Sequence, residues 1–156
     1  MTRSGRSLWM VLVLLLAAGI PAAAQDATRA CEQVSGGMLV QVHGVRSDKG
    51  TLVAVLYGDK PDEFLKKGAR LARERVPARP GSVALCLETP RPGLYAVAVY
   101  HDENDNRKFD RAWTGLPSEG FGVSNNPKLF LRKPTHGESA VRVGPGHRVV
   151  NIDLRY

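Results

Sequence analysis

The sequence predicts an all-β protein: an antiparallel β-sandwich of about seven strands, immunoglobulin-like or transthyretin-like, with one long ordered loop. Three observations predict this fold. Apolar and polar residues alternate with a period of two along most of the chain. Clusters of Gly, Pro, Asp and Ser separate the alternating segments, and helical signals are confined to one short stretch. Short strands joined by turns are typical of a sandwich, and a small barrel is the rival fold.

Residues 1–24 have the features of a signal peptide. Arg3 and Arg6 precede an apolar stretch at 8–20, and small alanine residues end the segment. The apolar stretch is shorter than the ~20 residues that a membrane span needs, and no later segment is longer. We therefore expect a periplasmic or secreted protein with no transmembrane segment, in which residues 25–156 form a single sandwich domain.

The charge of the chain is basic, with a net value of +7. Loss of Arg3 and Arg6 with the leader lowers this value from +7 to +5. The basic residues are scattered through 66–79 and 130–134, which is typical of a solvated face. Scatter and export both argue against nucleic acid as a partner. Weak attraction to an anionic envelope surface is compatible with this charge.

Cys31 and Cys86 are the two cysteines of the chain. In an exported protein such a pair is expected to form one disulfide. Closing a loop of about 56 residues stabilises a fold by roughly 4 kcal/mol in the chain-entropy model. The bond would hold the N-terminal segment to a central strand. A redox or thiolate metal site is the weaker alternative, because the sequence has no C-x-x-C motif.

The first two strands are expected at 38–46 and 51–57. The first alternates and has one apolar face, whereas the second is apolar on both faces and is expected at the centre of a sheet. We expect a hairpin across the turn residues 47–50. The inner face of the first strand would carry Met38, Val40 and Val42, with Gln41 and His43 opposite.

The later elements follow the same pattern. One or two helical turns are expected at 59–68, where Pro61 stands near a first-turn position and Gly68 ends the segment. The C-terminal strand should turn Val150, Ile152, Leu154 and Tyr156 inward and Asn151, Asp153 and Arg155 outward. The remaining strands are expected at 70–76, 83–87, 94–101, 138–143 and 149–156, with a turn at 90–93.

The segment 101–128, about 28 residues, shows no periodicity. Loops longer than roughly 12–15 residues in a compact domain are usually functional or disordered. This loop contains apolar residues that could pack against one end of the sandwich, so we expect it to be ordered. These residues are Trp113, Leu116, Phe121 and Val123.

The start of this loop has the spacing of a calcium site, with oxygen-bearing residues at alternate positions. The expected ligands are Asp102, Asn104, Asn106, the backbone carbonyl of Lys108, and Asp110. Two positions depart from the calcium pattern. Arg107 stands where a glycine is usual, and Trp113 stands where a bidentate glutamate is usual; Glu119 could take the place of that glutamate.

The alternative interpretation needs no metal. Asp and Asn side chains bond the backbone two residues further on, and they tolerate left-handed backbone angles. A string of such turns would stiffen the loop by itself. Both interpretations stay open, with calcium as the one candidate cofactor, and both make the loop architectural rather than catalytic.

Two segments carry a resemblance to a known family: "PGLYAVAVYHDENDNRKFD" at 92–110 and "GLPSEGFGVSNNP" at 115–127. They resemble the signature of a bacterial family of exported proteins that is catalogued only as a domain of unknown function. The resemblance covers roughly residues 31–156. It implies a periplasmic or secreted β-sandwich, and it implies no established activity.

Catalytic signals are weak. The four histidines lack zinc-site spacing, Ser124 lacks the second glycine of a nucleophile elbow, and acidic pairs such as Asp110 with Glu119 occur in any protein. We therefore expect a non-catalytic binding or interaction module whose partner is an unknown envelope protein or surface ligand. The alternatives are a structural or accessory protein of the cell envelope without a small ligand, and a carboxylate-based envelope hydrolase. The expected interaction surface is Trp113, Phe121, Ser124 and Asn125.

Overall fold

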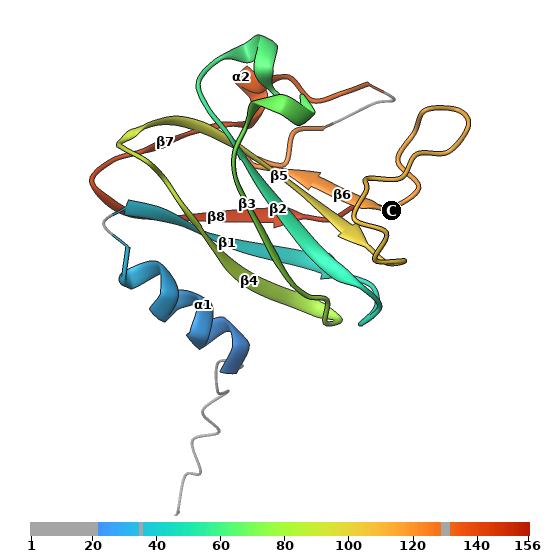
Figure 1. The fold of residues 1–156 in the computed structure, drawn as a ribbon, viewed down its shortest axis with the longest axis horizontal. Helices are drawn as coiled ribbons and strands as arrows, with labels where there is room; N and C mark the ends of the chain where they lie inside the picture. The colour runs from blue at the N-terminus through green and yellow to red at the C-terminus, as the bar shows by residue number, and fades with distance from the viewer. Residues whose placement is uncertain (1–21, 35, 129–131) are drawn as a thin grey trace, which may run out of the picture.

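The computed structural model describes residues 22–34, 36–128 and 132–156. The expected signal peptide lies outside the described residues up to position 21. The described part of the chain forms eight strands in two sheets that pack face to face, which confirms the predicted sandwich (Figure 1). The strands are β1 Gly36–Val45, β2 Thr51–Tyr57, β3 Arg70–Pro77, β4 Gly81–Glu88, β5 Gly93–Asp102, β6 Gly120–Val123, β7 Ala140–Val143 and β8 Gly146–Asp153.

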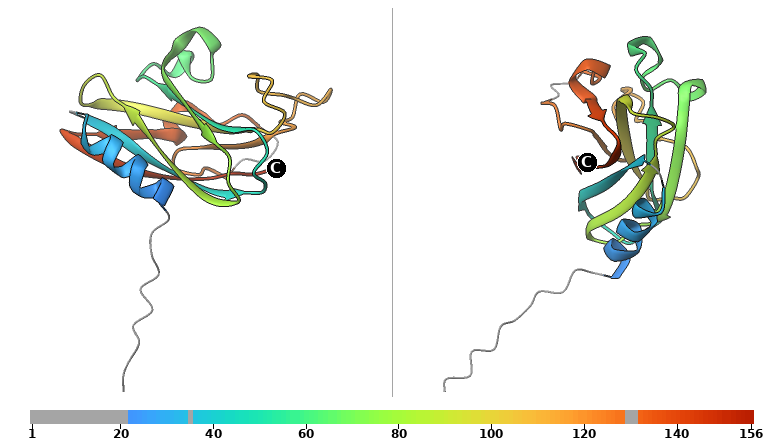
Figure 2. Two further views of the ribbon diagram at one scale, coloured as in Figure 1. Left: turned by 60° about the horizontal axis from the view of Figure 1, so that its bottom comes forward. Right: turned by 90° about the vertical axis from the view of Figure 1, so that its left-hand side faces the viewer.

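The smaller sheet has the strand order β4-β1-β8, and the larger one has the order β3-β2-β5-β6, with β7 also paired to β5. Figure 2 shows the two sheets as separate layers. The pairings are antiparallel except for β1 and β8, which run parallel with Val40 opposite Val150. Parallel neighbours need a long connection, and the chain between β1 and β8 includes the strands of the larger sheet. The period-two pattern of β1 or β8 therefore could not reveal that the two strands pair.

The predicted hairpin of residues 38–46 with 51–57 is wrong. β1 pairs with β4 and β8, whereas β2 pairs with β3 and β5. The turn at 47–50 therefore crosses from one sheet to the other. Gly50 makes this crossing possible, because it has a φ of +64° and a Cβ on it would lie 1.9 Å from the carbonyl oxygen of Asp102.

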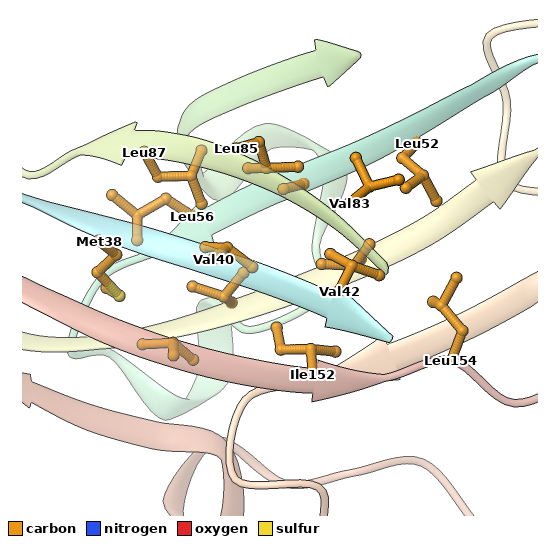
Figure 3. Close-up of a cluster of buried hydrophobic side chains, with 14 of the residues drawn as sticks. Met38, Val40, Val42, Leu52, Leu56, Val83, Leu85, Leu87, Ile152 and Leu154 are labelled. Atoms are coloured by element: carbon orange, nitrogen blue, oxygen red, sulfur yellow. The ribbon is translucent and has the colours of Figure 1, made fainter. Parts of the chain in front are cut away.

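The main core lies between the sheets, and its buried residues come mostly from alternate positions of six strands, with Ala72 and Val76 of β3 packed against it. As predicted, the inner face of β1 is fully buried (Figure 3). β2 is buried on both faces, which confirms its expected central place. Labelled core residues in Figure 3 are Met38, Val40, Val42, Leu52, Leu56, Val83, Leu85, Leu87, Ile152 and Leu154.

A second, smaller core covers the outer face of the larger sheet. Phe64, from the connection after β2, and Phe109, from the long loop, pack over residues of β2 and β5. The long loop is therefore tied to the sheet by apolar contacts. The expected helical turns in 59–68 are two 3-10 turns, Pro61–Glu63 and Lys67–Ala69.

An N-terminal helix, α1 (Ala22–Glu32), was not predicted. It packs beside β4 (Figure 2), and Cys31 in it forms the predicted disulfide with Cys86, with Cα atoms 5.3 Å apart. β4 lies at an edge of its sheet, not at the centre as expected. A second helix, α2 (His136–Ser139), begins with a capping box of Thr135 and Glu138. No helix within the described ranges is long and apolar enough to span a membrane.

Candidate functional site

The segment 102–110, here called the knot, starts where β5 ends. Asp102 is fully buried and its carboxylate accepts three hydrogen bonds. Oδ1 accepts from the backbone N–H of Asn106 at 3.0 Å, and Oδ2 accepts from that of Arg107 at 2.9 Å. Arg75 of β3 adds an ion pair, with Nη2 3.2 Å from Oδ2. Both oxygens of Asp102 therefore face nitrogen donors.

The asparagines of the knot continue this pattern. Oδ1 of Asn104 accepts from the N–H of Asn106 at 3.1 Å, and Oδ1 of Asn106 accepts from the N–H of Lys108 at 2.8 Å. The amide groups of both asparagines donate to Oδ2 of Asp110, at 2.9 and 2.7 Å. Two knot residues, Asp105 and Arg107, take left-handed φ values of 51° and 63°. These are the self-bonded turns of the metal-free interpretation.

The calcium interpretation gains no support from these contacts. Lys108 takes part through its N–H donor, whereas a calcium loop needs its carbonyl. The Arg75 guanidinium already lies against Asp102, where a divalent cation would have to compete with it. Within the described ranges, no group of three or more His, Cys, Asp or Glu residues is arranged to hold a metal ion. Calcium and the self-bonded knot stay alternatives, and the geometry favours the self-bonded knot.

Glu119 does fold back onto the knot. Its Oε2 accepts a hydrogen bond from the backbone N–H of Asp110 at 3.1 Å. Its Oε1 is buried and has no hydrogen-bond partner among the described residues. Burial raises the pKa of the Glu119 carboxyl, and the neighbouring carboxylates of Asp102 and Asp110 raise it further. A carboxyl group that is costly to ionise therefore lies against the knot.

Phe109 joins the knot to the sheet. Its ring lies 5.4 Å from the ring of Tyr100 on β5 and 5.4 Å from that of Phe121 on β6, between centroids. The Arg111 guanidinium covers the Phe109 ring at 4.9 Å. Phe109 thus tethers the long loop to the sheet, and its ring brings the loop into contact with β6.

A pocket of about 460 Å³ lies beside this contact. Its walls come from the turn 111–117, from β6, from the end of β8 and from residues 132–134. The apolar part of the lining includes Leu65, Phe109, Leu116, Phe121, Val123, Pro127 and Pro134. The pocket therefore sits at the edge of the larger sheet, where the long loop closes over β6.

The charged part of the lining is mostly cationic. It contains Arg111, Arg132, Lys133 and Arg155, against one carboxylate, Asp153. Arg132 forms an ion pair with Glu138, and Arg155 donates to the carbonyl of Pro127 at 3.4 Å. Lys133 makes no ion pair with another described residue. The lining therefore offers positive charge beside an apolar surface.

The last residue of the chain completes one wall. The hydroxyl of Tyr156 lies 2.8 Å from Nδ1 of the fully buried His101. Nε2 of that histidine lies 2.8 Å from the carbonyl oxygen of Lys49, so Nε2 carries the proton and Nδ1 accepts from the tyrosine. The Arg46 guanidinium lies 4.2 Å from the centre of the Tyr156 ring. These contacts fix Tyr156, although it was expected to face the core and is 48% exposed.

The expected interaction residues lie in different settings. Trp113 is 98% exposed and Phe121 lines the pocket. Ser124 is fully buried, where it accepts from the N–H of Val97 at 2.9 Å and donates to the carbonyl of Ser139, so it belongs to the interior and not to the surface. Asn125 is exposed, but its amide donates to the carbonyl of Ala140 at 2.9 Å. The residues that the sequence analysis missed are the cations of the pocket and Tyr156, which lie far apart in the chain.

Asp153 is the one acid among the described residues of this lining. Glycoside hydrolysis uses two acids that flank the substrate. Glu119 meets Asp110 through the backbone N–H and not through the side chain. The arrangement can hold an anion against an apolar surface, but it lacks a pair of facing carboxylates.

A comparison with protein families places most of the chain in a family model. The family model described as "Uncharacterized protein conserved in bacteria (DUF2141)" matches residues 40–151. This range contains both segments on which the resemblance rests. Neither the curated proteins nor the solved structures gave a match.

Proposed function

The chain belongs to DUF2141, a family of proteins conserved in bacteria, and we propose that it is an exported, non-catalytic module that binds a small amphipathic anion in the pocket beside the knot. The observation that carries this proposal is the composition of the lining. Phe109, Phe121 and Leu116 offer an apolar surface. Arg132 is paired with Glu138, and the other three lining cations outnumber the one lining acid, Asp153. A ligand with an apolar body and one acidic group matches both parts.

The size of the pocket supports a small ligand. Its volume of about 460 Å³ falls in the range of roughly 300–1,000 Å³ that is usual for ligand sites. Such sites combine apolar side chains with a few placed polar groups. A fatty acid or an aromatic acid of moderate length has the chemistry that this lining would recognise.

The walls of the pocket are held in place by the protein itself. The knot fixes Phe109, and the bond from Tyr156 to His101 fixes the C-terminal wall. A preorganised wall lowers the entropy cost of binding. This gives the self-bonded knot a role in binding that needs no metal.

Export to the periplasm or beyond is part of the proposal. The disulfide of Cys31 with Cys86 supports it, because such bonds persist in oxidising compartments. The leader-like segment at 1–24 also supports it. The second candidate function is an accessory protein of the cell envelope, in which the same apolar and cationic surface would contact a protein partner.

Isothermal titration with three ligands of equal chain length tests the proposal: dodecanoate, dodecanol and dodecyltrimethylammonium. We expect saturable binding of one dodecanoate per protein, weaker binding of the alcohol and the weakest binding of the cation. Absence of saturable dodecanoate binding would contradict the proposal.

Charge variants locate the site. Lys133→Gln should weaken dodecanoate binding about two- to fivefold, since an exposed charge pair contributes about 0.5–1 kcal/mol. Binding of dodecanol should be unchanged in this variant. Arg148→Gln is the matched control, because Arg148 is exposed on β8 and is not part of the lining. If both variants weakened dodecanoate binding equally, the carboxylate of the ligand would not lie beside Lys133.

A further inference from the structure

We infer that the turn 111–117 docks the protein on an anionic lipid surface; the inference rests on the proposed function, because it names a bilayer as the source of the pocket's amphipathic anion. In Figure 1 the gold loop between β5 and β6 projects from the sandwich. Trp113 lies in this turn and is 98% exposed, and Leu116 in the same turn is 44% exposed. Two large apolar side chains are therefore presented to solvent within four residues.

The turn that presents them is internally bonded. The N–H of Ala112 donates to the carbonyl of Leu116 at 2.8 Å, and that of Gly115 donates to the carbonyl of Ala112 at 2.8 Å. Gly115 takes the left-handed φ of +82° that this tight turn requires. Arg111 and Pro117 form a bridge at its base. The backbone of the turn thus has its own bonds, and Trp113 makes no ring contact with another described residue.

Exposed tryptophan suits the interface of a bilayer. The indole ring has a large apolar body of about 150–250 Å² and one N–H donor, and this combination is enriched at the level of the lipid headgroups. Trp113 and Leu116 alone are too small for a stable protein interface, which needs about 800 Å² from each partner. The lipid surface is therefore the occupant that fits the size of the patch.

The charges around the turn fit anionic lipids. Arg111 belongs to the turn itself, and Arg132, Lys133 and Arg155 line the pocket that the turn adjoins. All four are exposed, and basic groups near a bilayer are attracted to anionic headgroups. The apolar tip and the cations together are the two elements of an interfacial anchor.

The position of the pocket connects docking to uptake. Thr114, Gly115 and Leu116 contribute to its lining. A turn that sits among the headgroups would thus bring the pocket to the surface of the bilayer. An amphipathic anion could pass between lipid and protein over a short distance, with its acidic group near the cations throughout.

Vesicle binding tests this inference on protein purified after export. Once residues 1–24 are removed, Trp113 is the one tryptophan of the chain, so its fluorescence reports the turn alone. We expect a blue shift of the emission and cosedimentation with vesicles of phosphatidylcholine and phosphatidylglycerol. Vesicles of phosphatidylcholine alone should bind the protein more weakly, and added salt should reduce the difference.

Two variants separate the turn from the rest of the surface. Trp113→Ser should reduce vesicle affinity about tenfold or more, because interfacial binding scales with buried apolar area, while the melting temperature stays the same. Leu71→Ser is the matched control, since Leu71 is 52% exposed on β3 and should leave vesicle binding unchanged. An unshifted emission, or equal vesicle binding of wild type and Trp113→Ser, would overturn the inference.

Titration of dodecanoate without vesicles distinguishes ligand binding in the pocket from docking of the turn on a lipid surface. Trp113→Ser should bind free dodecanoate as wild type does, because Trp113 does not line the pocket. Dodecanoate binding without vesicle binding would overturn the docking and leave the proposed function standing. Vesicle binding that depends on Trp113, without dodecanoate binding, would support the docking and overturn the proposed ligand.

Discussion

The rings of Phe109 and Phe121 lie 5.4 Å apart between centroids, and this contact joins the knot to β6 at the apolar lining of the pocket. The two residues are separated by the whole turn 111–117, so their contact closes the loop on itself. Tyr100 lies under Phe109 at the same distance. The shape of the pocket therefore depends on a loop that is held by side-chain bonds and by three packed rings.

Phe109→Ala should lower the free energy of unfolding by about 2 kcal/mol, less than the 3–5 kcal/mol of a fully buried ring, because Phe109 is half-buried. It should also weaken dodecanoate binding. Urea denaturation measures the first effect. Trp113→Ala is the control, because Trp113 is 98% exposed and should leave stability unchanged. An equal loss of stability in both variants would contradict the claim that packing of Phe109 holds the loop on the sheet.

Asp102→Ala should be more damaging, at about 2–4 kcal/mol. The change removes a buried acceptor of two backbone N–H groups and of Arg75. It leaves the N–H of Arg107 without its acceptor, whereas the N–H of Asn106 keeps its bond to Asn104 and Arg75 keeps its contact with Asp105. Asp105→Asn is the matched control, since Asp105 also contacts Arg75, at 3.5 Å, but is 54% exposed, and asparagine tolerates its left-handed φ of 51°. We expect the control to cost less than about 1 kcal/mol. Comparable losses would show that the buried bonds of Asp102 are not the main support of the knot.

Calcium should leave the melting temperature unchanged. The oxygens of Asp102, Asn104 and Asn106 already accept from backbone N–H groups. Melting curves in millimolar calcium and in chelator should therefore coincide. A rise of a few degrees that Asp102→Ala and Asp110→Ala both abolish would establish a calcium site instead.

Glu103 should make stability fall in acid. The Glu103 carboxylate accepts hydrogen bonds from the Arg46 guanidinium and the Ser47 hydroxyl, and these lower its pKa from 4.5 to about 2. Its contribution is therefore complete above the unfolded pKa and is lost as the pH falls from about 4.5 to about 2. Glu103→Gln should flatten the dependence of unfolding free energy on pH in this range. A slope equal to that of wild type would contradict the assignment.

Glu119 should act in the opposite sense. Burial raises the pKa of its carboxyl, so the folded state holds this proton more tightly than the unfolded chain does. Its stabilising effect is present at low pH and is lost as the pH rises through the folded pKa. Glu119→Gln should therefore gain stability over wild type at neutral pH and less so in acid. A gain that is equal at both pH values would contradict the raised pKa of the Glu119 carboxyl.

Much of the fold could be predicted from local pattern. The alternation of Met38, Val40 and Val42, and the two apolar faces of β2, follow from the pleat of a strand. The disulfide of Cys31 with Cys86 followed from the cysteine count and from expected export. These features depend on residues near in sequence or on a single possible pairing.

Strand pairing could not be predicted in the same way. A strand pattern shows which face is buried, but it does not show which neighbour the strand has, so the hairpin of β1 with β2 was wrong. β6 was missed because glycines stand at 120 and 122 and hide the alternation. A Cβ on Gly120 would lie 2.4 Å from the Tyr156 ring, and one on Gly122 would lie 2.6 Å from the carbonyl oxygen of Asp153. The close approach of β6 to the end of β8 requires these glycines.

The candidate site shows the same limit. The spacing of Asp102, Asn104 and Asn106 indicated convergence at one place, but it could not distinguish a metal from the N–H groups of the loop itself. The cations of the pocket come from separate parts of the chain, and only the fold brings them together. Basic residues that are far apart in the sequence do not by themselves indicate that they line one pocket.

The most direct test of the central claim is an NMR titration of ¹⁵N-labelled protein with dodecanoate. The amides of Gly115, Phe121 and Val123, which belong to the pocket lining, should shift in a saturable way, while those of β3 stay constant. A second groove lies between α1 and β4 and includes Ala30 and Val83. Shifts confined to this second groove, or the absence of saturable shifts at the pocket beside the knot, would contradict the account.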